Sequence, residues 1–378
     1  MTVADAARLR DLTLELVEVP SPTGDTAEVA SLYAQHLEQI GMEVELLDDV
    51  FPATPTVLAR LRGSSPGPTI VLNGHLDTVP IPHDRPRIDG DLVYGRGSAD
   101  MKGALAAAAE AVRVLGDGSR LSGDVVIVAI GLHEAPGGRG EDLEHLLRDR
   151  RFTADAAVVC ELSAHDVAVA HLGSATFAIT VSRPGMPTHE LQTPPGTPHP
   201  LLAAARVVEA IRRRHEELSA VEHPWVGAET YFLGEVHGGD FYNRHPTSCR
   251  LVGTCRWAPT NSLAAVEADF RRRLDEVARE TGCDIDLDLT LVRGAYEIDP
   301  GHELVAALQD AYREVTGDEL RPVGMKVVAD GAVFTAAGIP TVYHGPQGSG
   351  AHADVECISI AELVRAADVY VALLGRLL

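Results

Sequence analysis

The chain has 378 residues and a formal net charge of −23 at pH 7, because 55 Asp and Glu residues outnumber 32 Lys and Arg residues. Nucleic acids and anionic membranes attract basic surfaces, so we expect neither as a partner of this acidic chain. Hydrophobic residues make up 45% of the sequence and aromatic residues 4%, which is typical of a globular protein with an Ala, Val and Leu core. This length exceeds one ordinary hydrophobic core, so we expect two domains.

The N-terminal stretch carries acidic residues and lacks the apolar region of a secretion signal. No apolar run approaches the length needed to span a bilayer. The five cysteines are odd in number and lack C-x-x-C spacing, so we expect reduced thiols in a cytoplasmic protein.

Helices and strands alternate along the first 160 residues. The hydrophobic periodicity predicts a helix ending before Pro20, a helix at 26–40, strands at 42–47, 56–61 and 69–72, an Ala-rich helix at 104–115, and strands at 123–130 and 156–159. Strands that alternate with helices of this length indicate an α/β layer with a largely parallel sheet.

The pattern changes near residue 173. A strand at 174–181, a helix at 200–218, strands at 230–236 and 249–256, a helix at 262–281 and a strand at 285–292 follow the β-α-β-β-α-β order of a ferredoxin-like domain. Helices at 303–316, 331–337 and 359–377, with a strand at 340–343, then restore the α/β pattern. We therefore expect an α/β fold with a central largely parallel sheet flanked by helices (residues 1–172 and 293–378), interrupted by an inserted ferredoxin-like α+β lid and dimerisation domain (residues 173–292).

Chemically active side chains follow the predicted strands. The strand at 69–72 leads to His75 and Asp77. Residues i and i+2 of an extended chain share a face, so Asp77 can hold one ring nitrogen of His75 and leave the other for a metal. Alone, such a pair is more often part of a solvated loop after a strand. The carboxyl ends of parallel strands meet at one sheet edge, and the chain places further zinc-type ligands there: Asp100, His133, Glu134, Glu161, His344 and His352.

Five ordered motifs carry a resemblance to a known family: GHLDTVP, GRGSADMKG, HEAPGG, Glu161 after a strand, and AHADVE. Together they resemble the di-zinc amidohydrolase and metallopeptidase family of aminoacylases, glutamate carboxypeptidases, acetylornithine deacetylases and succinyl-diaminopimelate desuccinylases. The resemblance implies that His75, Asp100 and Glu161 hold a first zinc. It implies a second zinc that shares Asp100 and uses His352, with Glu134 as the catalytic general base and Asp77 as a further catalytic residue.

The HEAPGG segment departs from the family's D-E-E-x-G-G motif. Alignment on the glycines places Ala135 where the second zinc's carboxylate belongs, and a methyl group cannot coordinate a metal. His133 stands in for the Asp beside the base and could supply a ligand. Consecutive residues of an extended segment face opposite ways, so we do not expect His133 to reach the metal. We expect a weakened second site and one or two ions per chain, zinc or else cobalt or manganese.

The inserted domain adds three residues by resemblance. His189 would stabilise the oxyanion in the partner subunit of a homodimer, which forms through this domain. Asn243 and Arg256 would contact a substrate carboxylate, although solvated surface positions explain Asn243 equally well. The apolar residues at 327–329, before Asp330, replace the small and hydroxyl-bearing residues that the resemblance predicts, so the substrate can differ from the common ones.

The function that follows is metal-dependent hydrolysis of an amide bond in an N-acyl amino acid or small peptide-like substrate. A metal activates the attacking water, and Glu134 moves the proton. Two alternatives stay open at this point. The fold could have been repurposed for acyl transfer, amide formation or cyclisation, or the chain could be a non-catalytic binding homologue.

Overall fold

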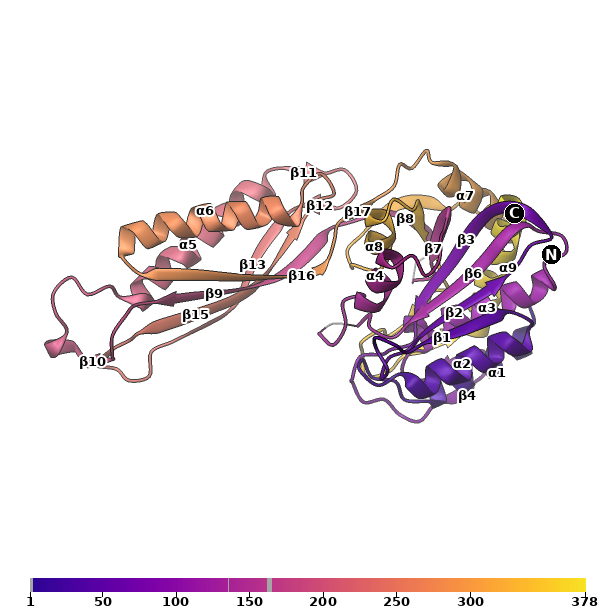
Figure 1. Cartoon of the computed structure of the whole chain (residues 1–378), viewed down its shortest axis with the longest axis horizontal. Helices are drawn as coiled ribbons and strands as arrows, with labels where there is room; N and C mark the ends of the chain where they lie inside the picture. Colours follow the sequence, from indigo (N-terminus) through magenta and orange to yellow (C-terminus); the bar gives the residue numbers. More distant parts are fainter. Residues whose placement is uncertain (1–2, 135, 162–164) are drawn as a thin grey trace. The chain divides into compact units, whose positions relative to one another are not determined.

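The computed structural model describes residues 3–134, 136–161 and 165–378 (Figure 1). The chain forms two compact units, described separately below. Unit 1 comprises Met1–Val169, Glu297–Val323 and Ala329–Leu378, and unit 2 comprises Ala170–Tyr296 and Gly324–Val328. The sequence placed the inserted domain at residues 173–292 and did not assign the short segment Gly324–Val328 to it.

Unit 1 is built on a mixed sheet whose central strands are parallel. The strands lie in the order β1 (Glu43–Leu47), β2 (Thr56–Leu61), β6 (Ser122–Ile130), β3 (Ser65–His75), β7 (Ala156–Val159), β19 (Thr341–Tyr343), β8 (Asp166–His171) and β17 (Tyr296–Glu297), with β18 (Arg321–Met325) pairing with β8. β3 runs parallel to both of its neighbours, β6 and β7, and β7 runs parallel to β19. The expected α/β class with a largely parallel central sheet is confirmed.

The centre of this sheet is apolar because helices cover both faces. Ile70, Val71 and Leu72 of β3 are buried, as expected for a strand between parallel neighbours. The helices α1 (Ala6–Glu18), α3 (Gly103–Leu115), α7 (Glu303–Thr316) and α9 (Ile360–Leu377) form one layer, and α2 (Ala27–Gln39) packs on β1 and β2. On the other face α4 (Glu141–Arg148) contacts α8 (Gly331–Ala336) (Figure 1). Polar side chains therefore occur mainly toward the ends of the central strands.

A small antiparallel sheet joins distant parts of unit 1. Its strands are β20 (Gly348–Ser349), β21 (Cys357–Ser359), β5 (Leu92–Tyr94) and β4 (Arg87–Asp89), in that order. The pairing of β21 with β5 brings the segment before Asp100 beside the segment after His352. Glu356 is buried there and accepts hydrogen bonds from the backbone N–H groups of Ala99 and Asp100, at 2.9 and 3.0 Å.

Unit 2 has the expected ferredoxin-like arrangement. Its antiparallel sheet has the order β13 (Thr230–Gly238), β15 (Ser248–Trp257), β9 (Gly173–Ser182) and β16 (Asp284–Arg293). Helices α5 (Pro200–Ser219) and α6 (Leu263–Thr281) contribute to the core on one face of this sheet, so buried and exposed residues alternate along β9 and β15. A Cβ atom on Gly173 would lie 2.2 Å from the indole of Trp257, so glycine is required where β9 begins.

Smaller elements complete the unit: β10 (Thr188–His189) pairs with β14 (Arg244–His245), and β11 (Glu222–His223) pairs with β12 (Gly227–Ala228). All five cysteines are free thiols. Within the described residues, no helix has the length and apolar character needed to cross a membrane.

Candidate active site

One cluster of side chains in unit 1 lies at the ends of three neighbouring parallel strands. β3 ends on His75, β7 is followed by Glu161, and β6 is followed by His133 and Glu134. Because the sheet order is β6-β3-β7, these ends meet at one edge. The sequence predicted that His75, Glu134 and Glu161 gather at this edge, and the structure brings them together with His133 as well.

Asp77 organises the loops around this edge. Its buried carboxylate accepts hydrogen bonds from the backbone N–H of His133 at 3.1 Å and of Glu134 at 2.8 Å, and from the Thr23 hydroxyl at 2.8 Å. The carboxylate oxygen lies 3.5 Å from His75 Nδ1, whereas the Asp77 carbonyl oxygen accepts a bond from that nitrogen at 2.9 Å. The expected support of His75 therefore comes from the backbone of Asp77, and the carboxylate shapes the 133–134 segment instead.

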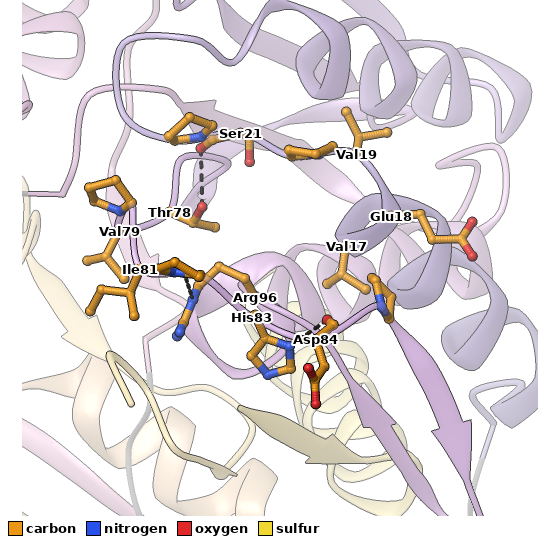
Figure 2. A pocket seen from close by; sticks show the side chains of 15 residues that line it. Val17, Glu18, Val19, Ser21, Thr78, Val79, Ile81, His83, Asp84 and Arg96 are labelled. Carbon is orange, nitrogen blue, oxygen red and sulfur yellow. Dashed lines mark hydrogen bonds between the residues drawn. The ribbon is translucent and has the colours of Figure 1, made fainter. Parts of the chain in front are cut away.

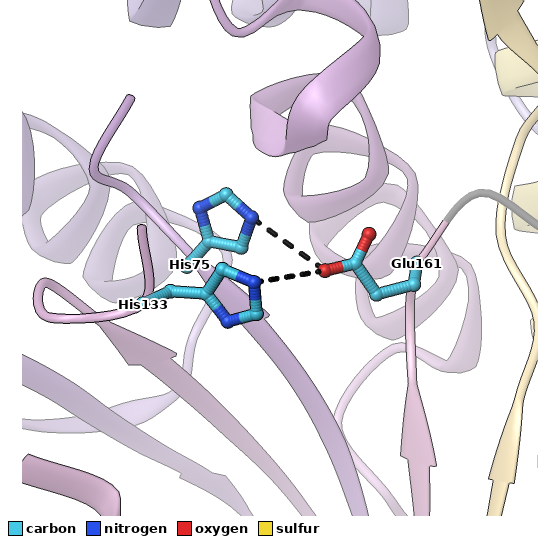
Figure 3. A group of neighbouring side chains, drawn as sticks. All are labelled: His75, His133 and Glu161. Carbon is cyan, nitrogen blue, oxygen red and sulfur yellow. Dashed lines mark ion pairs between the residues drawn. The ribbon is translucent and has the colours of Figure 1, made fainter. Parts of the chain in front are cut away.

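One candidate ligand group consists of His75, His133 and Glu161 (Figure 3). Nε2 of His75 and Nε2 of His133 lie 3.6 and 3.5 Å from the same oxygen, Glu161 Oε1. The two imidazole rings stack, with centroids 4.1 Å apart and planes within 3° of parallel.

A second candidate group shares His75 and adds Asp100 and Glu134. Asp100 Oδ1 lies 3.1 Å from His75 Nε2, and Asp100 Oδ2 lies 3.3 Å from His352 Nε2. His352 also contacts Glu134 Oε1 at 3.0 Å and has a left-handed backbone with φ of 61°. A positive φ on a non-glycine residue is a strain that proteins retain mainly at functional sites.

Mixed imidazole and carboxylate donors at these spacings fit a divalent metal. In a tetrahedral zinc site with bonds of about 2.1 Å, neighbouring ligand atoms lie about 3.4 Å apart. The contacts within the cluster span 3.0 to 3.6 Å. The donor set suits zinc, cobalt or manganese alike.

Burial and neighbouring charges shift the acidity of the cluster. Burial raises the pKa of the Glu134 carboxyl above its usual value, although the His75 imidazole opposes this shift. The hydrogen bond to Asp100 raises the pKa of His352 to about 9. Although burial disfavours a charge on Asp100, hydrogen bonds from His352 and His75 hold the pKa of that carboxyl well below its usual value. Glu134 is the carboxyl of this cluster placed to take up a proton.

The expectation that His133 points away from the cluster is wrong. β6 ends at Ile130, and residues 131–134 lie outside any strand. Both N–H groups of His133 and Glu134 bind the single Asp77 carboxylate, so the backbone curves around it and both side chains reach the cluster. Ala135, on which the weakened second site depends, lies outside the described residues.

Two residues of this region were missed as site residues, and a third was quoted without a role. Asp330 precedes α8, and its Oδ2 accepts a hydrogen bond from His133 Nδ1 at 2.8 Å. Thr23 binds Asp77 from the loop after α1. Glu356 holds the backbone beside Asp100. Asp330 carried a usable signal, since it is an acidic residue directly before a predicted helix, but nothing in the sequence indicates its partner.

His344 was grouped with the other strand-end ligands, but the structure places it in neither candidate ligand group of the described residues. It is fully buried beside Tyr312 and Tyr370, and its Nε2 lies 3.4 Å from the Arg365 guanidinium. Burial, reinforced by the charge of Arg365, lowers the pKa of His344 to about 3.

This lowered pKa predicts a pH dependence of stability. Between pH 6.5 and 3 the unfolded chain binds a proton at residue 344 that the folded chain does not, so stability falls as the pH falls. We expect wild type to lose about 2 kcal/mol more than His344→Phe between pH 7 and pH 5. Urea unfolding followed by circular dichroism measures this difference. Parallel losses in the two proteins would contradict the prediction.

The three predicted residues of unit 2 lie in two places. His189 Nε2 is 3.1 Å from the Asn243 amide nitrogen, and both residues are exposed or half-buried beside the β10–β14 pair, close to the start of β15. Arg256 lies eight residues beyond Ser248 along β15, which corresponds to roughly 27 Å. Within the described part of the chain, Arg256 Nη1 is buried without a hydrogen-bond partner.

A pocket of unit 1 lies apart from the ligand cluster (Figure 2). It is bounded by the turn after α1 and the loop after Asp77, where Ser21 and Thr78 bind each other. Five prolines contribute to its lining, namely Pro20, Pro22, Pro80, Pro82 and Pro86, together with Arg96. The Arg96 guanidinium is directed to Glu356 at 2.7 Å. None of the candidate metal ligands lines this pocket.

Imidazoles and carboxylates gather at the ends of parallel strands around a buried carboxyl, which is the arrangement of a candidate metal-binding active site. The family follows from comparison with known proteins. The chain belongs to peptidase family M20/M25/M40, whose model matches residues 71–376. This membership confirms the expected family and the expected enzyme class, hydrolysis of amide bonds.

Curated relatives cover nearly the whole chain. It is 28% identical to an N-formyl-4-amino-5-aminomethyl-2-methylpyrimidine deformylase of Halalkalibacterium halodurans, over 93% of this chain and 90% of that protein. It is 27% identical to a succinyl-diaminopimelate desuccinylase of Methylobacterium radiotolerans, over 97% and 96%.

Solved structures share the fold of both units. Aminopeptidase PepT from Bacillus cereus has a TM-score of 0.81 and 22% identity, covering 99% of both chains. The YXEP protein of Bacillus subtilis, described as a dinuclear metal-binding peptidase of the M20 family, has a TM-score of 0.74 and 17% identity, covering 98% of both chains.

Proposed function

We propose that this protein hydrolyses the amide bond of a small N-acylated substrate, an N-acyl amino acid or a peptide-like amide, by a metal-dependent reaction with Glu134 as general acid and base. The observation that carries the proposal is the position of Glu134. Its buried carboxyl has a raised pKa and lies among imidazoles and carboxylates that fit a divalent metal.

In unit 1 the ligand cluster would bind the metal, and Glu134 would transfer the proton. A bound divalent ion would lower the pKa of a water toward about 7 and polarise the substrate carbonyl. Glu134 takes the proton of the attacking water, and later delivers it to the leaving nitrogen. Asp77 fixes the backbone of Glu134 for this task through a bond of 2.8 Å. Nε2 of His352 lies 3.3 Å from Asp100 Oδ2 and 3.0 Å from Glu134 Oε1, so His352 is in contact with both carboxylates.

The substrate class follows from the relatives and from unit 2. The two curated relatives are named as a deformylase and a desuccinylase, which supports removal of an acyl group from nitrogen. Arg256 is half-buried, and within the described residues its buried Nη1 has no hydrogen-bond partner, which suits a substrate carboxylate.

Unit 2 also supports a homodimer. His189 and Asn243 lie together beside the β10–β14 pair, before β15 begins, and Arg256 lies roughly 27 Å along β15 from its first residue, Ser248. No small substrate bridges that distance, so we assign His189 and Asn243 to the site of the partner subunit, where His189 stabilises the oxyanion. Sedimentation equilibrium tests this assignment, which a monomeric active enzyme would refute.

A panel of amides tests the function directly. Purified enzyme would be assayed with N-formyl, N-acetyl and N-succinyl amines, each in a form with and without a carboxylate, and with dipeptides. We expect turnover of a carboxylate-bearing member, loss of at least 99% of the activity after chelation, and recovery with zinc, cobalt or manganese. Unchanged activity after complete metal removal would contradict the mechanism. Equal turnover of the matched neutral amides would contradict the role of the carboxylate.

The second metal site is expected to be weak because Ala135 supplies no ligand at the position of the family's carboxylate. We expect a native content near one ion per chain and a content near two in Ala135→Glu, measured by elemental analysis after equilibration with zinc. Ala135→Gln is the matched control, since its neutral amide is a poor zinc ligand. A native content near two would contradict the weakened second site.

A further inference from the structure

Each nitrogen of the His133 imidazole faces a carboxylate oxygen. Nδ1 lies 2.8 Å from Asp330 Oδ2, and Nε2 lies 3.5 Å from Glu161 Oε1. Asp330 is 1% exposed, so its negative charge is directed into the protein and toward the ring. A carboxylate at this distance accepts a hydrogen bond from Nδ1–H, which keeps the proton on Nδ1 and directs Nε2 toward Glu161.

His75, whose ring stacks on that of His133, lies on the same side of Glu161 and is also held at Nδ1. Its Nδ1 donates to the Asp77 carbonyl oxygen at 2.9 Å, and its Nε2 lies 3.6 Å from Glu161 Oε1. Because a carbonyl oxygen can only accept, His75 also carries its proton on Nδ1. Two parallel imidazoles therefore direct Nε2 toward one carboxylate oxygen (Figure 3), and Nε2 of His75 also lies 3.1 Å from Asp100 Oδ1. A bound metal would take the lone pairs of both Nε2 atoms in place of a proton.

These distances match a metal site better than a hydrogen-bonded cluster. Separations of 3.5 and 3.6 Å are too long for good hydrogen bonds between nitrogen and oxygen. They are close to the spacing of about 3.4 Å between ligand atoms around a tetrahedral zinc ion. The stacked rings keep both nitrogens directed toward Glu161.

The geometry points to His133 as a metal ligand that completes, with His75 and Glu161, a two-histidine, one-glutamate set, and to Asp330 as the residue that positions it. This assignment rests on the metal requirement of the proposed function. Such a set holds catalytic zinc with one position left for water. His133 stands where the family has an Asp, next to the general base Glu134, and it adds a nitrogen ligand. Ala135, two residues farther on, lacks the oxygen ligand that the family has at its position.

Metal binding by the full-length apoprotein tests the assignment without relying on turnover. Zinc affinity would be measured by competition with a chromophoric chelator, and the ligand field by the visible absorption of the cobalt(II) protein. We expect His133→Gln to bind zinc about 100-fold more weakly or worse, and to shift and weaken the cobalt bands as one nitrogen ligand is lost. His344→Phe is the control, because it removes a buried imidazole outside the cluster, and both readouts should stay unchanged.

Asp330→Asn provides a second measurement if His133→Gln does not fold. An amide oxygen can still accept from Nδ1 but lacks the charge, so we expect about 10-fold weaker zinc binding and cobalt bands that keep their pattern. Zinc affinity within threefold of wild type in both variants, with unchanged cobalt spectra, would overturn the assignment and leave the proposed hydrolysis intact. A wild-type enzyme that hydrolyses amides without binding any metal would overturn both.

Discussion

Replacement of Glu134 by Gln is expected to lower kcat by a factor of about 10² to 10⁴, the range that general acid–base catalysis supplies. Gln has the same shape, and its backbone N–H can still bind Asp77, so the loop is retained. An amide cannot take a proton from water. Steady-state kinetics on the substrate found with the amide panel measures the effect, and elemental analysis should show an unchanged metal content.

Glu141→Gln is the matched control for this variant. Glu141 begins α4, seven residues farther along the chain, and is absent from the candidate ligand groups of the described residues. Its kcat should equal that of wild type. If Glu134→Gln kept kcat within tenfold of wild type with its metal bound, the role of Glu134 as general base would be wrong.

Replacement of Asp77 by Asn is the second change with a large expected effect. Two backbone N–H groups and the Thr23 hydroxyl converge on the Asp77 carboxylate. An Asn side chain replaces one acceptor oxygen with a donor, so at least one of these groups loses its partner. Because this carboxylate sets the backbone of both His133 and Glu134, we expect metal affinity and kcat/KM each to fall by about 10- to 100-fold.

Thr23→Val tests how much of the effect of Asp77→Asn comes from the loss of one hydrogen bond to the carboxylate. It removes a single donor and leaves the two backbone bonds, so we expect less than about a tenfold loss of kcat/KM. Chelator competition and steady-state kinetics measure both variants. Equal losses in Asp77→Asn and Thr23→Val would show that the carboxylate does not organise the 133–134 segment.

The central sheet could be predicted because its signals are local. The apolar run at 69–72 and the polar His75 after it indicate a buried strand that ends at a sheet edge, and β3 has this form. The pairing of β18 with β8 and the membership of Gly324–Val328 in unit 2 could not be predicted in this way. These features depend on contacts between segments far apart in sequence, which periodicity does not report.

The same distinction applies to the site. The convergence of His75, Asp100, Glu134, Glu161 and His352 follows from strand ends that share an edge, together with the family's motifs. The direction of His133 does not, because it is set by hydrogen bonds to Asp77 and Asp330, the latter 197 residues away in sequence. The rule that neighbouring residues face opposite ways assumes a regular strand, and residues 131–134 lie outside any strand.

The pairing of β5 with β21 has a consequence for the synthesis of the protein. Asp100 is held by Glu356 and contacts His352, so its surroundings are complete only when residues near the C-terminus have docked. Domains of a nascent chain form N-terminal first, as the ribosome delivers them. A growing chain of 330 residues can therefore contain β3, β6 and β7 and still lack a finished catalytic centre. The surroundings of Asp100 are therefore complete only after residues 352–356 have been synthesised and docked.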